Sequence, residues 1–523
     1  MREYHRSEAS FEKYRSRIIL MGLFVFLFHG AKLNSNIIGI DTEDIIKLQG
    51  DFYGGWLTTG RQGLVFLKGL LGTLQFNPYF AGLLTLVFLI AAAVAFLGLW
   101  DRTGIDNGQR SSYAGWFLGG LLWISHPILT EQLYFSLQSA EICVGLLITA
   151  IALFLTMKGG RNRQPICFAA SILLLLLAFS LYQVFVVIYI FGTLTLLLLE
   201  GISGETADYK EILRRQLFPH AAVFLAAFVL NTLVTKAFFS SSDYLQGQIL
   251  WNSGDIISNF RAILGHMAKV CTGYGSIYYS LGYGVLCLFT TVLFLLVLKK
   301  KRQPIGGNLL QLFFLAALFF TPFLMTMVCG GAPVVRSQLV LPVMTGFLGY
   351  FDLRLWGMLR EMERRTLLIR AIAVCIGTIC LLTGLMQLQV TTRLYYTDRV
   401  RYEQDAALGR ELIDRIEQVR GREQYPLIVI GRKEFEGNHA CVLGEVTGRS
   451  FFDYDTEVEP AFFWSTRRII GFLHSLGKEY AMISQDRLEE AMEYSTYMPE
   501  WPAKNSVQVH EGMLIIKLSH FED

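Results

Sequence analysis

The sequence predicts an α-helical, multi-span membrane protein with a small α/β domain at its C-terminal end. Of the 523 residues, 53% are hydrophobic and only 17% are charged, whereas soluble proteins have about 25% charged residues. Apolar runs long enough to cross a bilayer recur up to about residue 390. From Thr391 the composition changes abruptly to mixed and charged. We therefore predict a membrane domain at residues 1–390 and a soluble domain at 391–523.

Eleven apolar runs have the length and composition of transmembrane helices. The number of spans depends on the tract 165–199, which is too long for one helix of ~20 residues. Ser180, Tyr182 and Gln183 interrupt it near the middle, so we divide it there into two spans. The predicted spans are Ile18–Leu33, Tyr79–Trp100, Tyr113–Ser125, Leu137–Met157, Pro165–Phe179, Tyr182–Leu199, Phe218–Phe238, Leu281–Leu298, Leu309–Val328, Gln338–Leu353 and Ala371–Leu388.

The distribution of Lys and Arg predicts the orientation in the membrane. Basic residues are dense in alternate loops, as in Lys299–Lys301, and cytoplasmic loops are the ones enriched in Lys and Arg. This places the N-terminus in the cytoplasm of a multi-pass cell-membrane protein, and the C-terminal domain outside. The net charge of +3 gives no indication of nucleic-acid binding. The eight cysteines are scattered without C-x-x-C spacing, so we expect neither a metal site nor a disulfide framework.

Two helices and three strands are predicted in the C-terminal domain. Apolar residues at helical spacing predict a helix at Asp398–Arg420 that continues from the last span. The segment Tyr425–Gly431 has the pattern of a buried strand. A helix at Thr466–Ser475, capped by Ser465, follows. The chain ends in a hairpin whose strands, Ser506–Val509 and Met513–Leu518, are joined by a turn at Glu511 and Gly512.

The loop Asn34–Gly72, between the first two spans, has the densest polar chemistry of the membrane half. Asp41, Glu43 and Asp44 lie within four positions, just outside a membrane-length apolar run. A carboxylate at this place can act as a general base on a substrate presented at the membrane surface.

The same loop continues with residues suited to binding a substrate. Trp56 offers an apolar or stacking face at interface depth, and Arg61 offers a fork of donors that fits phosphate. The alternative interpretation is an ordinary loop, in which the charges face water and Trp56 anchors the interface.

Three further polar groups lie at the predicted outer ends of spans, where ionisable residues are costly and often functional. His126 and Glu131 belong to a short loop, Tyr182 and Gln183 to the turn of the divided tract, and Arg336 to a loop between two spans. Each has a structural alternative. The histidine can cap a helix, the turn residues can satisfy the backbone exposed by the helix break, and the arginine can extend to the interface.

No Walker loop and no nucleotide-binding α/β domain is visible in the membrane half, which disfavours a cytoplasmic nucleotide-sugar mechanism.

Several short motifs follow one another along the chain. They are IDTEDI, W-x-x-x-G-R (Trp56, Gly60 and Arg61), NPYF, HPILTEQLYF, SLYQ and, in the tail, YYTDRVRYEQDAALGRELIDRIEQ. In this order the motifs resemble those of the type II glucosyltransferases, the Gtr proteins that modify O-antigen.

This resemblance implies a GT-C fold and sugar transfer from a polyprenyl-phosphate-linked donor, a hexose such as glucose, to a cell-envelope glycan on the outer face. It makes Asp41 the candidate base, with Asp44 as the nearest alternative, and assigns the lipid phosphate to Arg61 and Arg336. The other expected substrate-binding residues are Glu43, Trp56, His126, Glu131, Tyr182 and Gln183. The implied single displacement needs no cofactor, although an acidic cluster can bind a divalent metal.

Two hypotheses from other classes remain. A transporter or flippase of lipid-linked glycans would place charged residues inside the spans, and here they gather mostly in the loops. In a non-catalytic envelope scaffold, the acids of the first loop would be dispensable.

Overall fold

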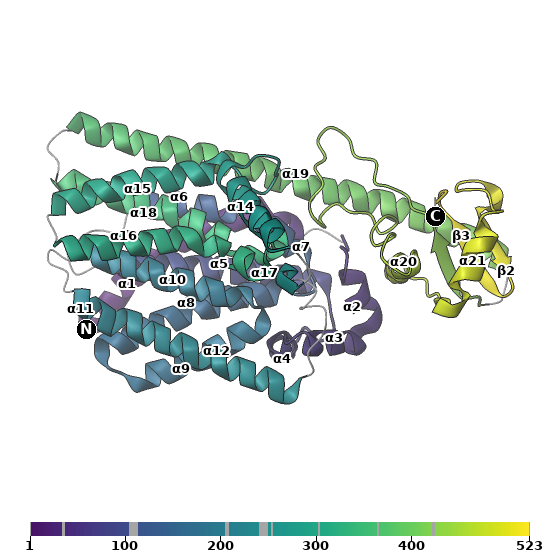
Figure 1. Cartoon of the computed structure of the whole chain (residues 1–523), viewed down its shortest axis with the longest axis horizontal. Coiled ribbons are helices and arrows are strands. Elements are labelled where there is room, and N and C mark those ends of the chain that lie inside the picture. The colour runs from purple at the N-terminus through teal and green to yellow at the C-terminus, as the bar shows by residue number, and fades with distance from the viewer. Residues whose placement is uncertain are drawn as a thin grey trace.

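The computed structural model describes residues 2–33, 37–103, 113–203, 209–239, 249–252, 255–301, 304–362, 366–420 and 424–521. Long helices run side by side in a bundle, and a small domain with a β-sheet lies beyond one end of it (Figure 1). The N-terminus lies at the opposite end. Residues 34–36, at the start of the predicted first loop, lie outside the described residues.

The bundle helices coincide with the predicted apolar runs. Asn77 begins α5, because its side-chain oxygen accepts from the backbone N–H groups of Tyr79 and Phe80 at 3.0 and 3.1 Å and Pro78 occupies the first helical position. This explains the NPYF motif. The helices are α1 (Arg2–His29), α5 (Pro78–Arg102), α6 (Tyr113–Ile124), α8 (Ser139–Asn162), α9 (Pro165–Leu181), α10 (Val184–Ser203), α12 (Phe218–Phe238), α15 (Leu281–Lys301), α16 (Ile305–Phe320), α18 (Val340–Met362) and α19 (Thr366–Arg420).

Eight helices in the described part of the chain are long and apolar enough to cross a membrane. The predicted break at Tyr182 and Gln183 is confirmed, since α9 ends at Leu181 and α10 begins at Val184. The three other predicted spans also form helices, but α6 and α9 have only 12 and 17 residues, and α18 includes charged residues such as Asp352 and Arg354. The number of eleven spans therefore stays a prediction.

Short helices gather at the end of the bundle that faces the C-terminal domain (Figure 1). They include α2 (Thr42–Leu48), α3 (Tyr53–Thr58), α4 (Gln62–Leu71), α7 (Pro127–Tyr134), α14 (Ile256–Thr272) and α17 (Leu324–Cys329). The other short elements among the described residues of the membrane half are α11 (Tyr209–Ile212), the π-helical turn η4 (Leu213–Leu217), and the 3-10 turns η1 (Gly30–Leu33), η2 (Gln49–Phe52), η5 (Leu250–Asn252), η6 (Thr321–Phe323) and η7 (Val335–Ser337).

Helix α19 runs without interruption for 55 residues from the bundle into the C-terminal domain. The predicted helix Asp398–Arg420 is therefore confirmed. Because α19 continues through residue 391, the division of the chain at that point stays a prediction.

The C-terminal domain contains a three-stranded sheet in the order β1-β3-β2. Strand β1 (Leu427–Ile430) pairs in parallel with β3 (Met513–Lys517), which pairs antiparallel with β2 (Val507–His510). The predicted strand and hairpin are confirmed. Glu511 and Gly512 have φ values of 43° and 76°, as a two-residue hairpin turn with both central residues left-handed requires. Helix α21 (Leu488–Ser495) and the turns η8 (Gln485–Arg487) and η9 (Lys504–Ser506) were not predicted.

The second helix of this domain, α20, spans Phe463–Ser475 and begins three residues earlier than predicted. The predicted cap was wrong. Ser465 lies inside the first turn, and its hydroxyl donates back to the carbonyl of Phe462 at 3.1 Å instead of accepting from the backbone. The residue directly before the helix is Phe462, which has a left-handed φ of 63°. The sequence did not indicate this.

Candidate functional site

The first-loop helix α2 packs against α20 of the C-terminal domain. The approach is close, since a Cβ on Gly471 of α20 would lie 2.9 Å from Cγ of Glu43. A glycine is needed there because any larger residue would push the two helices apart. The packing brings together side chains that are more than 400 positions apart in the sequence.

Arg468 of α20 binds three carboxylates at this contact. Its Nη1 lies 3.0 Å from both Asp41 Oδ1 and Glu43 Oε1, and its Nε lies 2.5 Å from Asp455 Oδ2. The nearby carboxylates raise the pKa of the Arg468 guanidinium despite its burial. Arg468 is therefore a permanent cation at the centre of what we call the carboxylate–arginine cluster.

Two further arginines complete this cluster. Arg467 Nη2 lies 3.0 Å from Asp44 Oδ2, and Arg336 Nη1 lies 4.0 Å from Asp41 Oδ2. The guanidinium of Arg336 stands over the ring of Phe135, 4.1 Å from its centroid, which favours one orientation of the charge. The structure thus brings together four predicted site residues, namely Asp41, Glu43, Asp44 and Arg336.

Burial distinguishes the three acids of the first loop. The side chain of Glu43 is fully buried, that of Asp44 is 15% exposed, and that of Asp41 is 36% exposed. Burial raises the pKa of Glu43 well above its ordinary value, although Arg468 opposes the shift, and burial also raises the pKa of Asp44. Asp41 has a left-handed backbone with φ of 70° directly before α2, a conformation that Asp tolerates better than most residues. Of these acids, Asp41 is the most accessible to a substrate.

Glu131 lies in a second network, on α7. Its Oε1 accepts from the backbone N–H groups of Val446 and Thr447 at 2.6 and 3.1 Å, and its Oε2 accepts from the hydroxyl of Tyr278. Burial, followed by the charge of Glu131, raises the pKa of the Tyr278 phenol, so the phenol stays a donor. Glu131 therefore attaches a loop of the C-terminal domain to the bundle.

This attachment continues towards the carboxylate–arginine cluster. The backbone N–H of Glu445 donates to the oxygen of Tyr278 at 2.7 Å, and Glu445 Oε2 accepts from the N–H of Val335 at 2.9 Å. Val335 precedes Arg336 in η7. The 445–447 loop thus holds the backbone that carries Arg336 beside Asp41.

Glu131→Gln is expected to loosen this loop. A neutral amide forms weaker hydrogen bonds than a carboxylate, by about 1 kcal/mol each, and two backbone N–H groups depend on Glu131. Amide hydrogen exchange at Val446 and Thr447 should therefore accelerate by about tenfold or more. Strand β1 is the internal control, because its exchange should not change. Equal protection of the loop in both proteins would show that Glu131 does not anchor it.

The other predicted substrate-binding residues lie elsewhere. His126 begins α7 by accepting from the N–H of Ile128 at 3.3 Å, the capping role that the sequence left open. Arg61 lies over the ring of Tyr182, 5.0 Å from its centroid, and the half-buried Gln183 follows Tyr182 at the break between α9 and α10.

Trp56 is buried within the first loop rather than exposed at an interface. Its ring packs near those of Phe52 and Tyr53, and the ammonium group of Lys68 lies 5.7 Å from the ring centroid. Lys68 is itself paired with Glu141 at 3.0 Å. Trp56 therefore supports the fold of the loop.

An open cavity of about 230 Å³ lies beside the carboxylate–arginine cluster, between α2 and the C-terminal domain. It is lined by Asp44, Asp455, Val458, Trp464, Arg467 and Arg468. Charged groups and one indole face this space, a set of side chains that can hydrogen-bond to hydroxyl groups and pack against a sugar ring.

Sequence reasoning missed Asp455, Arg467 and Arg468 of the cluster, and Glu445 of the second network. A signal for the arginines was present. Arginine is sparse in the predicted outer segments before the last span, which is why Arg336 was selected, and two adjacent arginines begin the predicted helix 466–475. The other two residues, Asp455 and Glu445, have no local sequence pattern that distinguishes them from solvent-exposed acids.

The acids of the first loop are thus paired with arginines. Within the described part of the chain, the group of His and acidic residues close enough to share a metal ion consists of Glu490, His510 and Glu511. It lies on the C-terminal domain, where Arg487 already pairs with Glu490 at 3.2 Å.

The sequence was compared with known families and proteins. A family model described as Glucosyl transferase GtrII matches residues 30–352, more than half of the chain. The matched part includes the first loop, Glu131 and Arg336, and it ends before α19 and the C-terminal domain. No curated protein matched the chain. As the order of its motifs predicted, the chain belongs to the GtrII glucosyl transferase family.

Proposed function

We propose that this membrane glucosyltransferase uses a polyprenyl-phosphate-linked sugar as donor and a hydroxyl of a cell-envelope glycan as acceptor. Transfer takes place on the extracytoplasmic face, within a GT-C-like membrane domain, with Asp41 as the general base. The family gives the class of reaction, and the apolar helices give the membrane setting. The donor, the acceptor, the side of the membrane and the base are our proposal.

The accessibility of Asp41 carries the assignment of the base. A general base must reach the proton of the acceptor hydroxyl. Glu43 is fully buried, and Asp44 is mostly buried and paired with Arg467. Asp41 shares Arg468 with two other carboxylates and keeps more than a third of its side chain exposed.

Arg336 stabilises the negative charge on the leaving group. In a single displacement, Asp41 takes the proton of the acceptor hydroxyl while that oxygen attacks the anomeric carbon. The bond between this carbon and the phosphate oxygen breaks, and the polyprenyl phosphate leaves with the electron pair. A guanidinium 4.0 Å from the base can stabilise the charge that develops on the phosphate. The cavity between α2 and the C-terminal domain is lined by Arg468, the partner of Asp41, and so lies beside the proposed base.

Arg336→Lys is expected to raise the KM for the donor by roughly tenfold. Lysine keeps the charge, but its ammonium group cannot reproduce the bidentate fork of arginine on a phosphate. The measurement is steady-state transfer with varied donor. Arg261→Lys is the matched control, since Arg261 is exposed on α14 at the same end of the bundle. An unchanged KM in the Arg336 variant would show that this arginine does not bind the donor phosphate.

The direct test is transfer by the purified, reconstituted protein. Polyprenyl-phosphate glucose and UDP-glucose are offered separately, each with the same envelope glycan as acceptor, and the product is analysed by mass spectrometry. We expect a hexose to be added from the lipid-linked donor only. Transfer from UDP-glucose alone would overturn the proposed donor, and movement of lipid-linked glycan across the vesicle without a new glycosidic bond would favour a flippase.

A further inference from the structure

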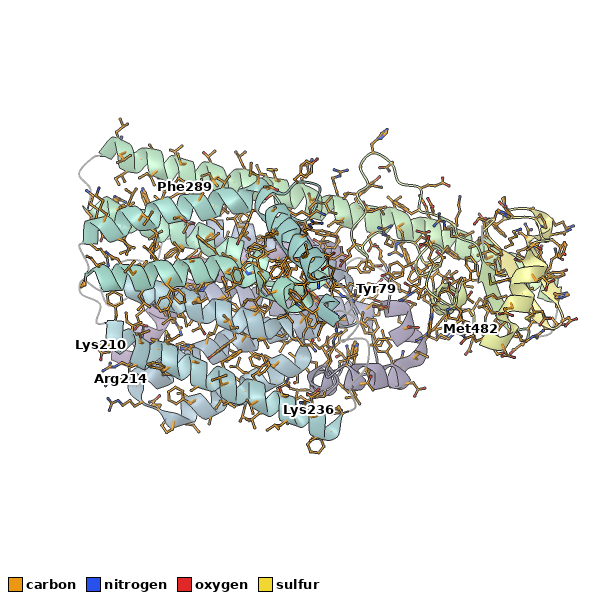
Figure 2. The ribbon with its side chains drawn as sticks, viewed as in Figure 1. Tyr79, Lys210, Arg214, Lys236, Phe289 and Met482 are labelled. Carbon is orange, nitrogen blue, oxygen red and sulfur yellow. The ribbon has the colours of Figure 1, made fainter. Side chains whose placement is uncertain are left out.

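A second cavity lies at the other end of the bundle, away from the carboxylate–arginine cluster. It has a volume of about 320 Å³ and lies where the end of α8 and the start of α9 meet the π-helical turn η4 and the start of α12. Figure 2 shows Arg214, one of its lining residues, at the end of the bundle opposite the C-terminal domain. By the predicted topology, this is the cytoplasmic end.

Three arginines line this cavity, namely Arg163, Arg214 and Arg215. Arg215 is paired with Glu211 at 2.6 Å. For Arg163 and Arg214, the described residues include no acidic partner within salt-bridge distance. No carboxylate lines the cavity, so among the described residues the charge facing this space is positive.

The backbone adds to this positive charge. Helix α9 begins at Pro165 on the rim of the cavity, and the side chain of Gln164 does not cap it. The first turn of a helix carries the positive end of the helix dipole. At α9 this dipole, rather than free N–H groups, adds the charge, because Pro165 has no N–H and the N–H of Cys167 donates to the carbonyl of Gln164 at 3.1 Å. An anion in the cavity would therefore meet guanidinium groups and a helix N-terminus together.

Close packing of α8 against η4 holds the three arginines around the same cavity. A Cβ on Gly160 would lie 1.9 Å from the carbonyl oxygen of Arg215, so only a glycine allows α8 and η4 to come this near. Arg163 follows directly after α8 with a left-handed φ of 53°. The π-helical turn carries Arg214 and Arg215, and such turns occur frequently at functional sites.

The rest of the cavity and its surroundings are apolar. Pro165, Phe168 and Pro219 line it, and the neighbouring Ile166 and Phe218 are 74% and 63% exposed. On membrane-spanning helices such exposed residues face acyl chains. The cavity thus joins a phosphate-binding region to a surface suited to hydrocarbon.

We propose that this cavity binds the phosphodiester of an anionic phospholipid, with the phosphate on Arg163 and Arg214 and the acyl chains along Phe168 and Phe218. Basic pockets between transmembrane helices on the cytoplasmic side are suited to anionic head groups. The assignment is independent of the glycosyl transfer reaction and of the base proposed for it.

The test is native mass spectrometry of the purified full-length protein, titrated with phosphatidylglycerol, phosphatidylcholine or inorganic phosphate. We expect saturable binding of phosphatidylglycerol, and at least tenfold weaker binding to the Arg163→Ala/Arg214→Ala protein, which loses two charge-assisted contacts. The Lys variant of both positions should lie between the two. The matched control is Lys299→Ala/Arg370→Ala, which removes two exposed charges from the same end of the bundle and should bind as the wild type does.

Three results would overturn the proposal. Equal affinity for phosphatidylcholine would show that the lipid is not selected by its charge. Displacement of the lipid by equimolar inorganic phosphate would identify a site for a free anion. Equal losses in the cavity variant and the control variant would show general electrostatic attraction to the membrane. Size-exclusion chromatography of each variant confirms that its binding is measured on folded protein.

Discussion

Asp41→Asn is expected to lower sugar transfer by ~10²–10⁴-fold, the usual cost of losing a positioned general base. Asparagine keeps the size of the side chain but cannot accept a proton at neutral pH. The fold should be retained, because Arg468 keeps the carboxylates of Glu43 and Asp455 as partners. The measurement is the initial rate of transfer from purified lipid-linked donor, with thermal unfolding in detergent as the control for stability.

Asp44→Asn is the comparison that assigns the base. Asp44 is mostly buried and bound to Arg467, so its variant should keep most of the activity. If the Asp41 variant transfers at the wild-type rate and the Asp44 variant does not, the roles are reversed. If both single variants and the double variant are fully active, the first-loop mechanism is wrong.

Arg468→Met should have the largest effect on stability, about 3–5 kcal/mol, because it leaves the carboxylate of Glu43 buried without its cation. Glu43 is fully buried in the contact between α2 and α20, so without Arg468 it either keeps an uncompensated charge or takes up a proton. In both cases the two helices lose the ion pairs that join them. The expected result is a lower midpoint of thermal unfolding and faster amide exchange in α2, with loss of transfer.

Two further variants make this result specific. Arg468→Met/Glu43→Gln removes the buried charge together with its partner and should recover much of the lost stability. Arg432→Met removes an exposed arginine of the same domain that pairs with Glu457 at 3.3 Å, and such surface pairs contribute about 0–1 kcal/mol. A stability of Arg468→Met equal to that of Arg432→Met would contradict the role of Arg468 in joining the two parts.

Local patterns predicted the elements of the fold well. Apolar runs located the bundle helices, and the polar interruption at Tyr182 and Gln183 located the break between α9 and α10. Glu511 and Gly512 located the hairpin turn. In each of these cases the signal lies within a few residues of the structure it produces. The start of α20 was missed because Phe462, which has a left-handed backbone and packs its ring against Phe521, precedes the helix, whereas Ser465 lies inside the first turn.

The candidate site was predicted only in part, for the same reason. The first-loop acids were visible as a cluster of charges, but their partners Arg467 and Arg468 come from a helix more than 400 residues away. No periodicity connects segments at such a distance. Glu131 is the clearest example, since the sequence shows a polar residue near the membrane, whereas its role depends on two backbone N–H groups of residues 446 and 447.

Helix α19 also contacts both parts of the chain that form the site, the first loop and the C-terminal domain. Arg401, buried on α19, donates to the carbonyl of Ile38 in the first loop at 3.1 Å, and Asp405, one turn later, accepts from Ser450 at 2.6 Å. At 1.5 Å per residue, 55 residues form a rod of about 80 Å. If this helix tilts in a thinner or thicker bilayer, the first loop and the C-terminal domain should move with it, and the distance between them should be preserved. The number of residues in α19 also fixes the rotation of the C-terminal domain about the helix axis. One inserted residue between the last span and Arg401 would rotate the C-terminal domain by about 100° and turn Arg467 and Arg468 away from the carboxylates.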